Sequence, residues 1–295
     1  MRWQPDVSRG AWIAERLDAD FGFHRVVPRG FPAYARIFHG IGADRPVGAS
    51  WADVGAAADR GEPWTGGIEA RTASWAEVAR VTGARMHPLA QWGAISRGRR
   101  DLVDAEGWRC SPPELGRLDA EELAAVARTL ARHTTTPEAG QAAVWEGWGG
   151  MFDDRSRAVL FFTPSGGAST EAPPEGLDDR PPLPREVRRG PRLRLPDREH
   201  VLFDAGIAEF ADAPDADEPW PLRAPWVRTP WAAESPALVW PEDRAWVLVS
   251  EIDWDSTVVG GTPELIAELV GGSGVEALEL PADADLSSTG DRLNA

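Results

Sequence analysis

The stretch WPEDRAWVLVSEIDWDSTVVGG, residues 240–261, constrains the fold more than any other part of the chain. In an extended backbone, Val247 and Val249 lie on one side, and Trp246 and Leu248 lie on the other. Because both sides are apolar, we expect this stretch to form a central strand that is buried on both faces of a sheet. Other parts of the chain must then cover two faces of that sheet.

Three stretches, residues 74–83, 118–133 and 262–272, are predicted to be helices. Each begins near a side chain that can accept a hydrogen bond from the first helical turn. These capping residues are Ser74, Asp119 and Thr262. The first helix also has the Ser–Glu spacing of a capping box, and the third has a proline at its first helical position.

Strands are predicted in residues 25–40, in residues 141–150, where a strand runs into a glycine turn, and in residues 157–164. Strands and helices do not alternate regularly along the chain. We therefore expect a mixed α+β fold, with a mainly antiparallel sheet and short flanking helices.

Residues 165–196 are rich in proline, glycine and charge, and they lack apolar periodicity. This composition predicts a long exposed loop or linker. It separates an N-terminal α+β part, residues 1–164, from a C-terminal α+β part, residues 197–295. We expect the two parts to pack together as one unit.

The charged residues exclude several classes of function. The chain has no lysine, so arginine supplies all 31 positive charges. Without lysine there is no Schiff-base enzyme, no pyridoxal-phosphate anchor and no Walker-type phosphate loop. The net charge of -16 opposes binding to nucleic acid.

The remaining composition predicts a cytoplasmic protein that does not enter a membrane. No apolar run approaches the roughly 20 residues of a membrane span, and the first residues lack the apolar segment of a signal peptide. The single cysteine, Cys110, cannot form an internal disulfide. The five histidines are scattered without the spacing of a metal site, so we expect no metal and no cofactor.

The acidic residues Glu251, Asp253 and Asp255 follow the apolar strand at intervals of two. In an extended chain they would face one side and could bind a metal or a cationic partner. The pair of aspartates resembles the first motif of haloacid-dehalogenase phosphatases, but too little chain follows it for that fold. The other interpretation is a strand end that emerges into solvent, with Asp255, Ser256 and Thr257 in the turn before the Thr262 helix.

A second candidate is Glu146, which lies between Trp145 and Trp148. Indole rings would solvate the carboxyl poorly and raise its pKa, as a general acid requires. With Asp253 or Asp255, Glu146 would then form a carboxylate pair suited to glycoside hydrolysis. The simpler interpretation is a glutamate at the end of a strand, in a tight glycine turn.

Tryptophan is abundant, with fifteen residues against one tyrosine. Such rings can stack on a ligand or receive arginine side chains, although they also anchor irregular loops to a core. The candidate binding residues combine the rings beside the acids with polar groups near the strand end. They are Trp145, Trp148, Glu251, Trp254, Ser256 and Thr257.

Four stretches, FPAYARIFHG, SWAEVARVTG, HTTTPEAGQAAVWEGWGG and WPEDRAWVLVSEIDWDSTVVGG, resemble an uncharacterised family of actinobacterial hypothetical proteins. That resemblance implies no reaction, cofactor or partner, because the family has no assigned activity. The stretch VWEGWGG is also similar to the SUKH group of toxin-immunity and scaffold proteins.

Two hypotheses of function follow from these observations. The first is a non-catalytic acidic binding protein, like an immunity or scaffold protein, that holds a basic protein partner. The alternative is a metal- or carboxylate-dependent hydrolase that uses Glu146 with Asp253 or Asp255.

Overall fold

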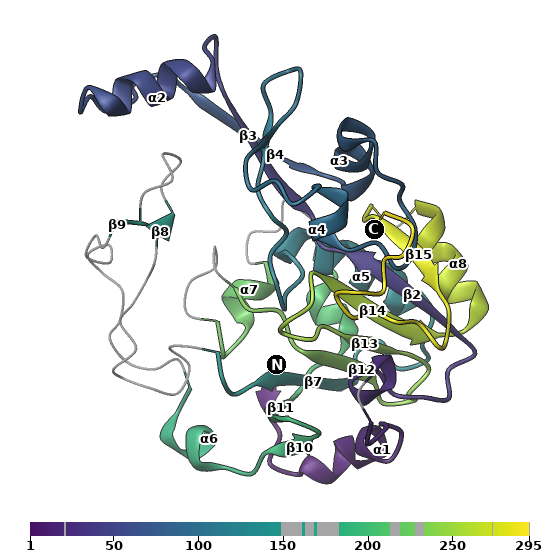
Figure 1. Ribbon diagram of the computed structural model, residues 1–295. Coiled ribbons are helices and arrows are strands. Elements are labelled where there is room, and N and C mark those ends of the chain that lie inside the picture. The colour runs from purple at the N-terminus through teal and green to yellow at the C-terminus, as the bar shows by residue number, and fades with distance from the viewer. Residues whose placement is uncertain are drawn as a thin grey trace.

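The computed structural model describes residues 1–20, 22–148, 161–162, 168–169, 183–212, 219–227, 233–272 and 274–294. Its strands form a nine-stranded sheet, a four-stranded sheet and a two-stranded pair, and every described pairing is antiparallel. Short helices surround the sheets (Figure 1). This arrangement confirms the predicted α+β class with a mainly antiparallel sheet.

The nine-stranded sheet is the centre of the molecule, and we call it and the elements that cover it the body. The main path through the sheet runs β1 (Arg2–Trp3), β11 (Arg198–Asp204), β7 (Gly140–Trp145), β12 (Leu238–Pro241), β13 (Val247–Val249), β14 (Ser256–Gly261), β2 (Ala33–Phe38) and β15 (Ala277–Leu280). The ninth strand, β10 (Leu193–Leu195), pairs with β11. Strands from the two predicted parts of the chain are interleaved in this sheet.

Strand β13 lies inside the sheet, between β12 and β14, and all of its residues are buried. Leu248 packs into the core on one face of the sheet, whereas Val247 and Val249 pack into the core on the other. The predicted central strand is therefore confirmed.

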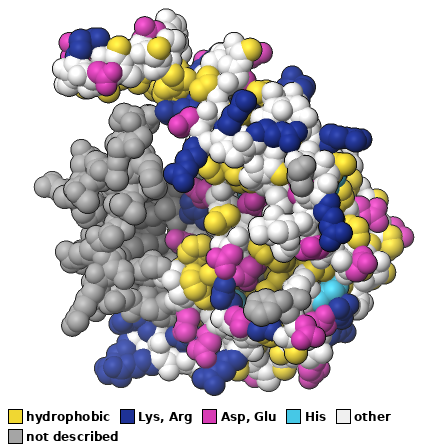
Figure 2. Space-filling view, in the orientation of Figure 1, with side chains coloured by type: hydrophobic (Ala, Val, Ile, Leu, Met, Phe, Trp, Pro, Cys, Tyr) yellow, Lys and Arg dark blue, Asp and Glu magenta, His cyan; other side chains and the backbone are white. Residues whose placement is uncertain are grey.

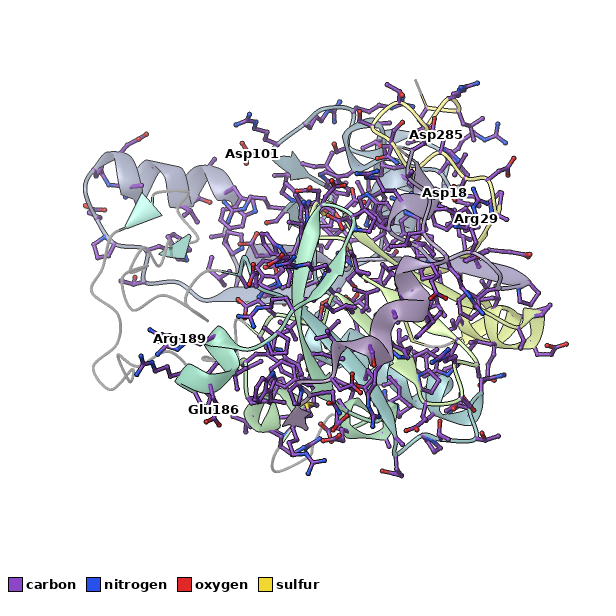
Figure 3. All side chains as sticks on the ribbon, turned by 90° about the horizontal axis from the view of Figure 1, so that it is seen from below. Asp18, Arg29, Asp101, Glu186, Arg189 and Asp285 are labelled. Carbon is purple, nitrogen blue, oxygen red and sulfur yellow. The ribbon has the colours of Figure 1, made fainter. Side chains whose placement is uncertain are left out.

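Different parts of the chain cover the two faces of the sheet. One face packs against α5 (Ala120–Arg132), α7 (Trp220–Arg223), α8 (Pro263–Gly272) and the 3-10 helix η3 (Ile207–Phe210). The other face packs against the N-terminal segment, with η1 (Val7–Gly10), α1 (Ala11–Ala14) and η2 (Phe23–Arg25). On that segment, Arg29 Nε donates to Asp18 Oδ1 at 2.7 Å, and the two side chains lie together in Figure 3.

The predicted helix caps are present. The Ser74 hydroxyl accepts from the Glu77 amide and the Glu77 carboxylate accepts from the Ser74 amide, which closes the capping box. Asp119 accepts from the Glu121 amide at the start of α5. At the start of α8, the Thr262 hydroxyl accepts from the Leu265 amide.

The four-stranded sheet forms a lobe, which we define as residues 41–110. Its strands are β4 (Ile68–Ala73), β3 (Ile41–Pro46), β6 (Arg109–Cys110) and β5 (Leu102–Val103), in that order. Its helices are α2 (Trp51–Asp59), α3 (Trp75–Thr82) and α4 (Trp92–Ile95). Figure 1 shows β3 and β4 leaving the body together, with α2 at their far end.

The predicted loop over residues 165–196 is wrong in its last part. Residues 183–196 contain α6 (Arg185–Arg189) and β10, and the side chains of Leu183, Val187 and Leu193 are buried. These three apolar residues pack into the cores of the body, which an exposed linker would not do. Of residues 165–182, the first part of the predicted loop, the structure describes only the short strand β9 (Ala168–Ser169).

The predicted strand over residues 157–164 is described only at β8 (Phe161–Phe162), which pairs with β9. The rest of that stretch and the glycine turn at residues 149–150 lie outside the described residues.

Of the helices in the described ranges, none has both the length and the apolar composition that a membrane span needs.

Truncating the central strand tests this architecture. The Leu248 side chain is 1% exposed, so Leu248→Ala leaves a cavity in the core, and we expect a loss of about 2–5 kcal/mol in the free energy of unfolding. Leu115 is 54% exposed, so Leu115→Ala is the matched control and should change it by less than about 0.5 kcal/mol. Urea unfolding measures the free energy of unfolding of both variants and of the wild type. Equal losses in the two variants would contradict the buried central strand.

Candidate functional site

The acidic stretch after β13 forms the tight turn of a hairpin. The amide of Trp254 donates to the carbonyl of Glu251 at 2.9 Å, and the chain then enters β14. The predicted position of Ser256 and Thr257 in a turn before α8 is wrong. Both residues are buried at the start of β14, because they pair with Phe38 and Ile37 of β2.

The three acids of this hairpin bind two different arginines. Glu251 and Asp253 both accept hydrogen bonds from Arg198 Nη2, at 2.9 and 3.0 Å. Asp255 pairs instead with Arg36, whose Nη2 donates to Oδ1 at 3.0 Å. The expectation that the acids share one side is wrong, because the chain turns between them and is not extended.

Arg36 lies on β2 with its side chain 2% exposed. Besides Asp255, it donates to the Ser256 hydroxyl at 2.8 Å and to the Ala90 carbonyl of the lobe at 2.7 Å. Its guanidinium also lies over the ring of Phe38, 4.6 Å from the centroid. Burial raises the pKa of the Asp255 carboxyl, and the charge of Arg36 opposes that shift. Arg36 is therefore a buried connection that joins β2 to the hairpin turn and to the lobe.

Asp255 also forms part of the wall of an open hollow of about 480 Å³. Trp92 and Asp291 contribute to the same wall. The carboxylate of Asp291 is fully engaged, since it accepts from His87, Asn294 and the Gln91 amide. Bonds to so many groups lower the pKa of Asp291 to about 2, although burial opposes the shift.

Glu146 is at the end of β7, where its carboxylate accepts from Arg192 Nε at 2.8 Å. The same guanidinium donates to the carbonyls of Arg188 and Gly190, at the C-terminal end of α6. Glu146 thus helps to fix the end of that helix. Within the described ranges, no hydrogen bond or ion pair joins Glu146 to Asp253 or Asp255.

The three tryptophans that were predicted to bind a ligand lie in two different environments. Trp145 and Trp148 meet edge to face at 5.6 Å, and the guanidinium of Arg198 lies 5.8 Å from the Trp145 ring centroid. Arg198 therefore brings Trp145 close to Glu251 and Asp253. Trp254 is partly buried, and it packs against the core on the face of the sheet that the N-terminal segment covers.

The hairpin turn requires a glycine on the segment beside it. Gly116 donates its amide to the Trp254 carbonyl at 2.8 Å. Its φ is +77°, and a side chain there would lie 2.7 Å from the Ile252 backbone. Only glycine combines this backbone conformation with so close an approach.

A buried chain of hydrogen bonds lies behind the hairpin and was not foreseen from the sequence. His39 Nδ1 lies 2.7 Å from the Glu114 carbonyl, which only accepts, so Nδ1 carries the proton. His39 Nε2 then accepts from the Thr257 hydroxyl at 3.0 Å, and that hydroxyl lies 2.6 Å from the Ser250 hydroxyl. Burial lowers the pKa of His39 to about 4, so the imidazole is neutral near pH 7.

A cavity of about 280 Å³ lies next to His39, between the body and the lobe, and its wall includes Glu122 of α5. Burial raises the pKa of Glu122 to about 7, and the neighbouring Asp119 charge adds to the shift. In the sequence Glu122 is an ordinary first-turn acid. Its partner, the amide of Gly40, is 82 residues away, so local patterns could not reveal the contact.

Among the described residues, no group of three or more histidine, cysteine, aspartate and glutamate side chains could hold a metal ion. The candidate acids at the strand ends are engaged by arginines. These contacts join neighbouring segments of the body.

Comparison with known proteins adds no further information on this site. No protein-family model matches the chain, and neither a curated protein nor a solved structure was found to match it.

Two acids of the hairpin should respond differently to the same substitution. Asp253→Asn should change the free energy of unfolding by less than about 0.5 kcal/mol, because the side chain is 74% exposed. Asp255→Asn leaves the buried Arg36 without its counter-charge and should cost about 3–5 kcal/mol. Denaturant unfolding of both variants gives the comparison, and equal losses would contradict it. Adding magnesium to the wild type should leave its melting temperature unchanged.

Proposed function

We propose that this protein is a non-catalytic binding protein that holds a basic protein partner against its acidic body. The observation that carries the proposal is the distribution of charge along the chain. Residues 41–110, the lobe, contain nine arginines and nine acidic residues, so the net charge of -16 belongs to the rest of the protein. In Figure 2, arginines and acidic side chains both lie on the lobe, and acidic side chains with arginines among them lie over the body.

A charge of this size attracts a basic partner over a distance and orients it before contact. The lobe, which is neutral, contributes little to that attraction. At the hairpin, Asp253 is the exposed acid, whereas Glu251 and Asp255 are largely covered. A basic side chain of the partner would compete with Arg198 for the Asp253 carboxylate.

The alternative hydrolase, with Glu146 and Asp253 or Asp255, has less support. Glu146 is bound by Arg192, Asp253 by Arg198 and Asp255 by Arg36. A general acid and a base need carboxyl groups that face one reacting bond. Three carboxylates held by three separate guanidinium groups favour a role in holding structure.

The proposal is tested by capturing a partner from native lysate with the wild type, identifying it, and measuring its dissociation constant. We expect the affinity to fall at least about tenfold between about 50 and 300 mM sodium chloride, because salt screens the attraction. Asp253→Lys should also weaken binding by about tenfold. The matched control is Glu62→Lys, on the neutral lobe, where the side chain is 59% exposed, and it should have less than about a twofold effect.

Binding that is insensitive to salt, or weakened equally by both variants, would contradict the proposal. Turnover of a glycoside or ester substrate that is lost in Glu146→Gln would support the hydrolase instead.

A further inference from the structure

The open hollow of about 480 Å³ beside Asp255 is built from three distant parts of the chain. The hairpin turn contributes Asp255, the lobe contributes the start of α4, and the segment after β15 contributes the rest. Two aspartates hold these parts together. Asp291 accepts from the Gln91 amide at 3.2 Å, and Asp255 interacts with the Trp92 amide. The wall of the hollow is therefore already in place before a ligand arrives.

Trp92 brings an aromatic side chain to this wall. Its ring meets the ring of the buried Trp75 at an angle of 67°, with 5.5 Å between the centroids, so the core of the lobe supports it. Trp92 itself is only partly buried. An indole that is supported by a core and partly uncovered at a cavity can stack on the flat apolar face of a ring-shaped ligand.

The polar groups of the wall suit a ligand with hydroxyl groups. Ser288 and Thr289 are exposed, and a hydroxyl can both donate and accept. The Asp255 side chain is 15% exposed, and a carboxylate has room for more than one donor. Nε2 of Gln91 is buried without a hydrogen-bond partner among the described residues, so a ligand oxygen would satisfy a donor that lacks one.

The charges of the wall favour a neutral ligand. Asp255 is already paired with Arg36, and Asp291, whose side chain is 2% exposed, is enclosed by its own hydrogen bonds. Neither carboxylate therefore requires a cation from a ligand, and both would repel an anion. The wall residues that the structure describes include no arginine that could bind a phosphate or a carboxylate.

We propose that this hollow binds one neutral pyranose sugar. The apolar face of the sugar ring stacks on Trp92, and its hydroxyl groups bond with Asp255, Ser288 and Thr289. On binding, the Gln91 amide turns towards the sugar and Nε2 gains a partner.

The size and shape of the hollow set the expected affinity. Its volume of about 480 Å³ is within the range of about 300–1,000 Å³ that ligand pockets have, and it leaves room for one sugar ring. Because the hollow is open, one side of the sugar stays in water, and we expect a dissociation constant of about 1–10 mM. The inference goes beyond the proposed function, and neither depends on the other.

The test is an NMR titration of the ¹⁵N-labelled wild-type protein with three neutral sugars, the methyl glycosides of glucose, galactose and mannose. At least one of them should shift the indole Nε1 resonance of Trp92 and the amide resonance of Thr289, with a dissociation constant of about 1–10 mM. The methyl glycoside of glucuronic acid, which is an anion, should bind at least about tenfold more weakly than that sugar.

Variants then locate the site. Trp92→Ala should weaken binding of the sugar at least about tenfold, whereas Trp92→Phe, which keeps an aromatic ring, should lose less. Ser288→Ala removes one exposed hydroxyl and should raise the dissociation constant about three- to tenfold. The matched control is Trp64→Ala, which removes a partly buried tryptophan of the lobe that lies outside this wall. It should leave the affinity within about twofold of the wild type.

A Trp92 resonance that none of the three neutral sugars shifts would overturn the proposal. So would equal affinities of Trp92→Ala and the wild type, or tighter binding of the glucuronic acid glycoside than of the neutral sugars. If Trp92→Ala does not fold, Ser288→Ala, which changes only an exposed side chain, decides the question, and an unchanged affinity in that variant would overturn the site.

Discussion

The buried guanidinium of Arg36 is the interaction on which the arrangement of body and lobe depends. A charge taken out of water is costly unless it is paired and its donors are satisfied. Here one side chain satisfies that requirement with groups from three places: the hairpin turn at Asp255, strand β14 at Ser256, and the lobe segment at Ala90. Each of those segments is therefore held at a fixed distance from β2.

Arginines that each bind several acceptors are also found at the other end of the sheet. Arg198 joins β11 to the hairpin acids, and Arg192 joins the end of α6 to Glu146. In a chain without lysine, the planar guanidinium with its five donors is the available cation, and it can bind several acceptors at once. The acids that look like catalytic candidates in the sequence are largely the partners of these arginines. The lobe is neutral in sum, so the net charge of -16 belongs to the rest of the chain.

Local features of the fold were predictable from the sequence. The caps at Ser74 and Asp119 depend on neighbours within one helical turn, and the apolar residues on both faces of β13 identify a central strand. The site was less predictable because its contacts join distant residues. Ser256 and Thr257 become strand through pairing with β2, and Glu122 meets Gly40 across 82 residues. One available signal was Arg36 itself, a single charged residue within the otherwise apolar AYARIF strand.

The most direct test of this account is a double-mutant cycle with Arg36→Met, Asp255→Asn and the double variant, using denaturant unfolding. If the pair is a buried connection, removing both charges leaves no unpaired ion. The double variant should then be more stable than the sum of the single losses predicts, by about 2 kcal/mol or more. Losses that add to within about 0.5 kcal/mol would show that the two side chains act independently, and would contradict the central role of this pair.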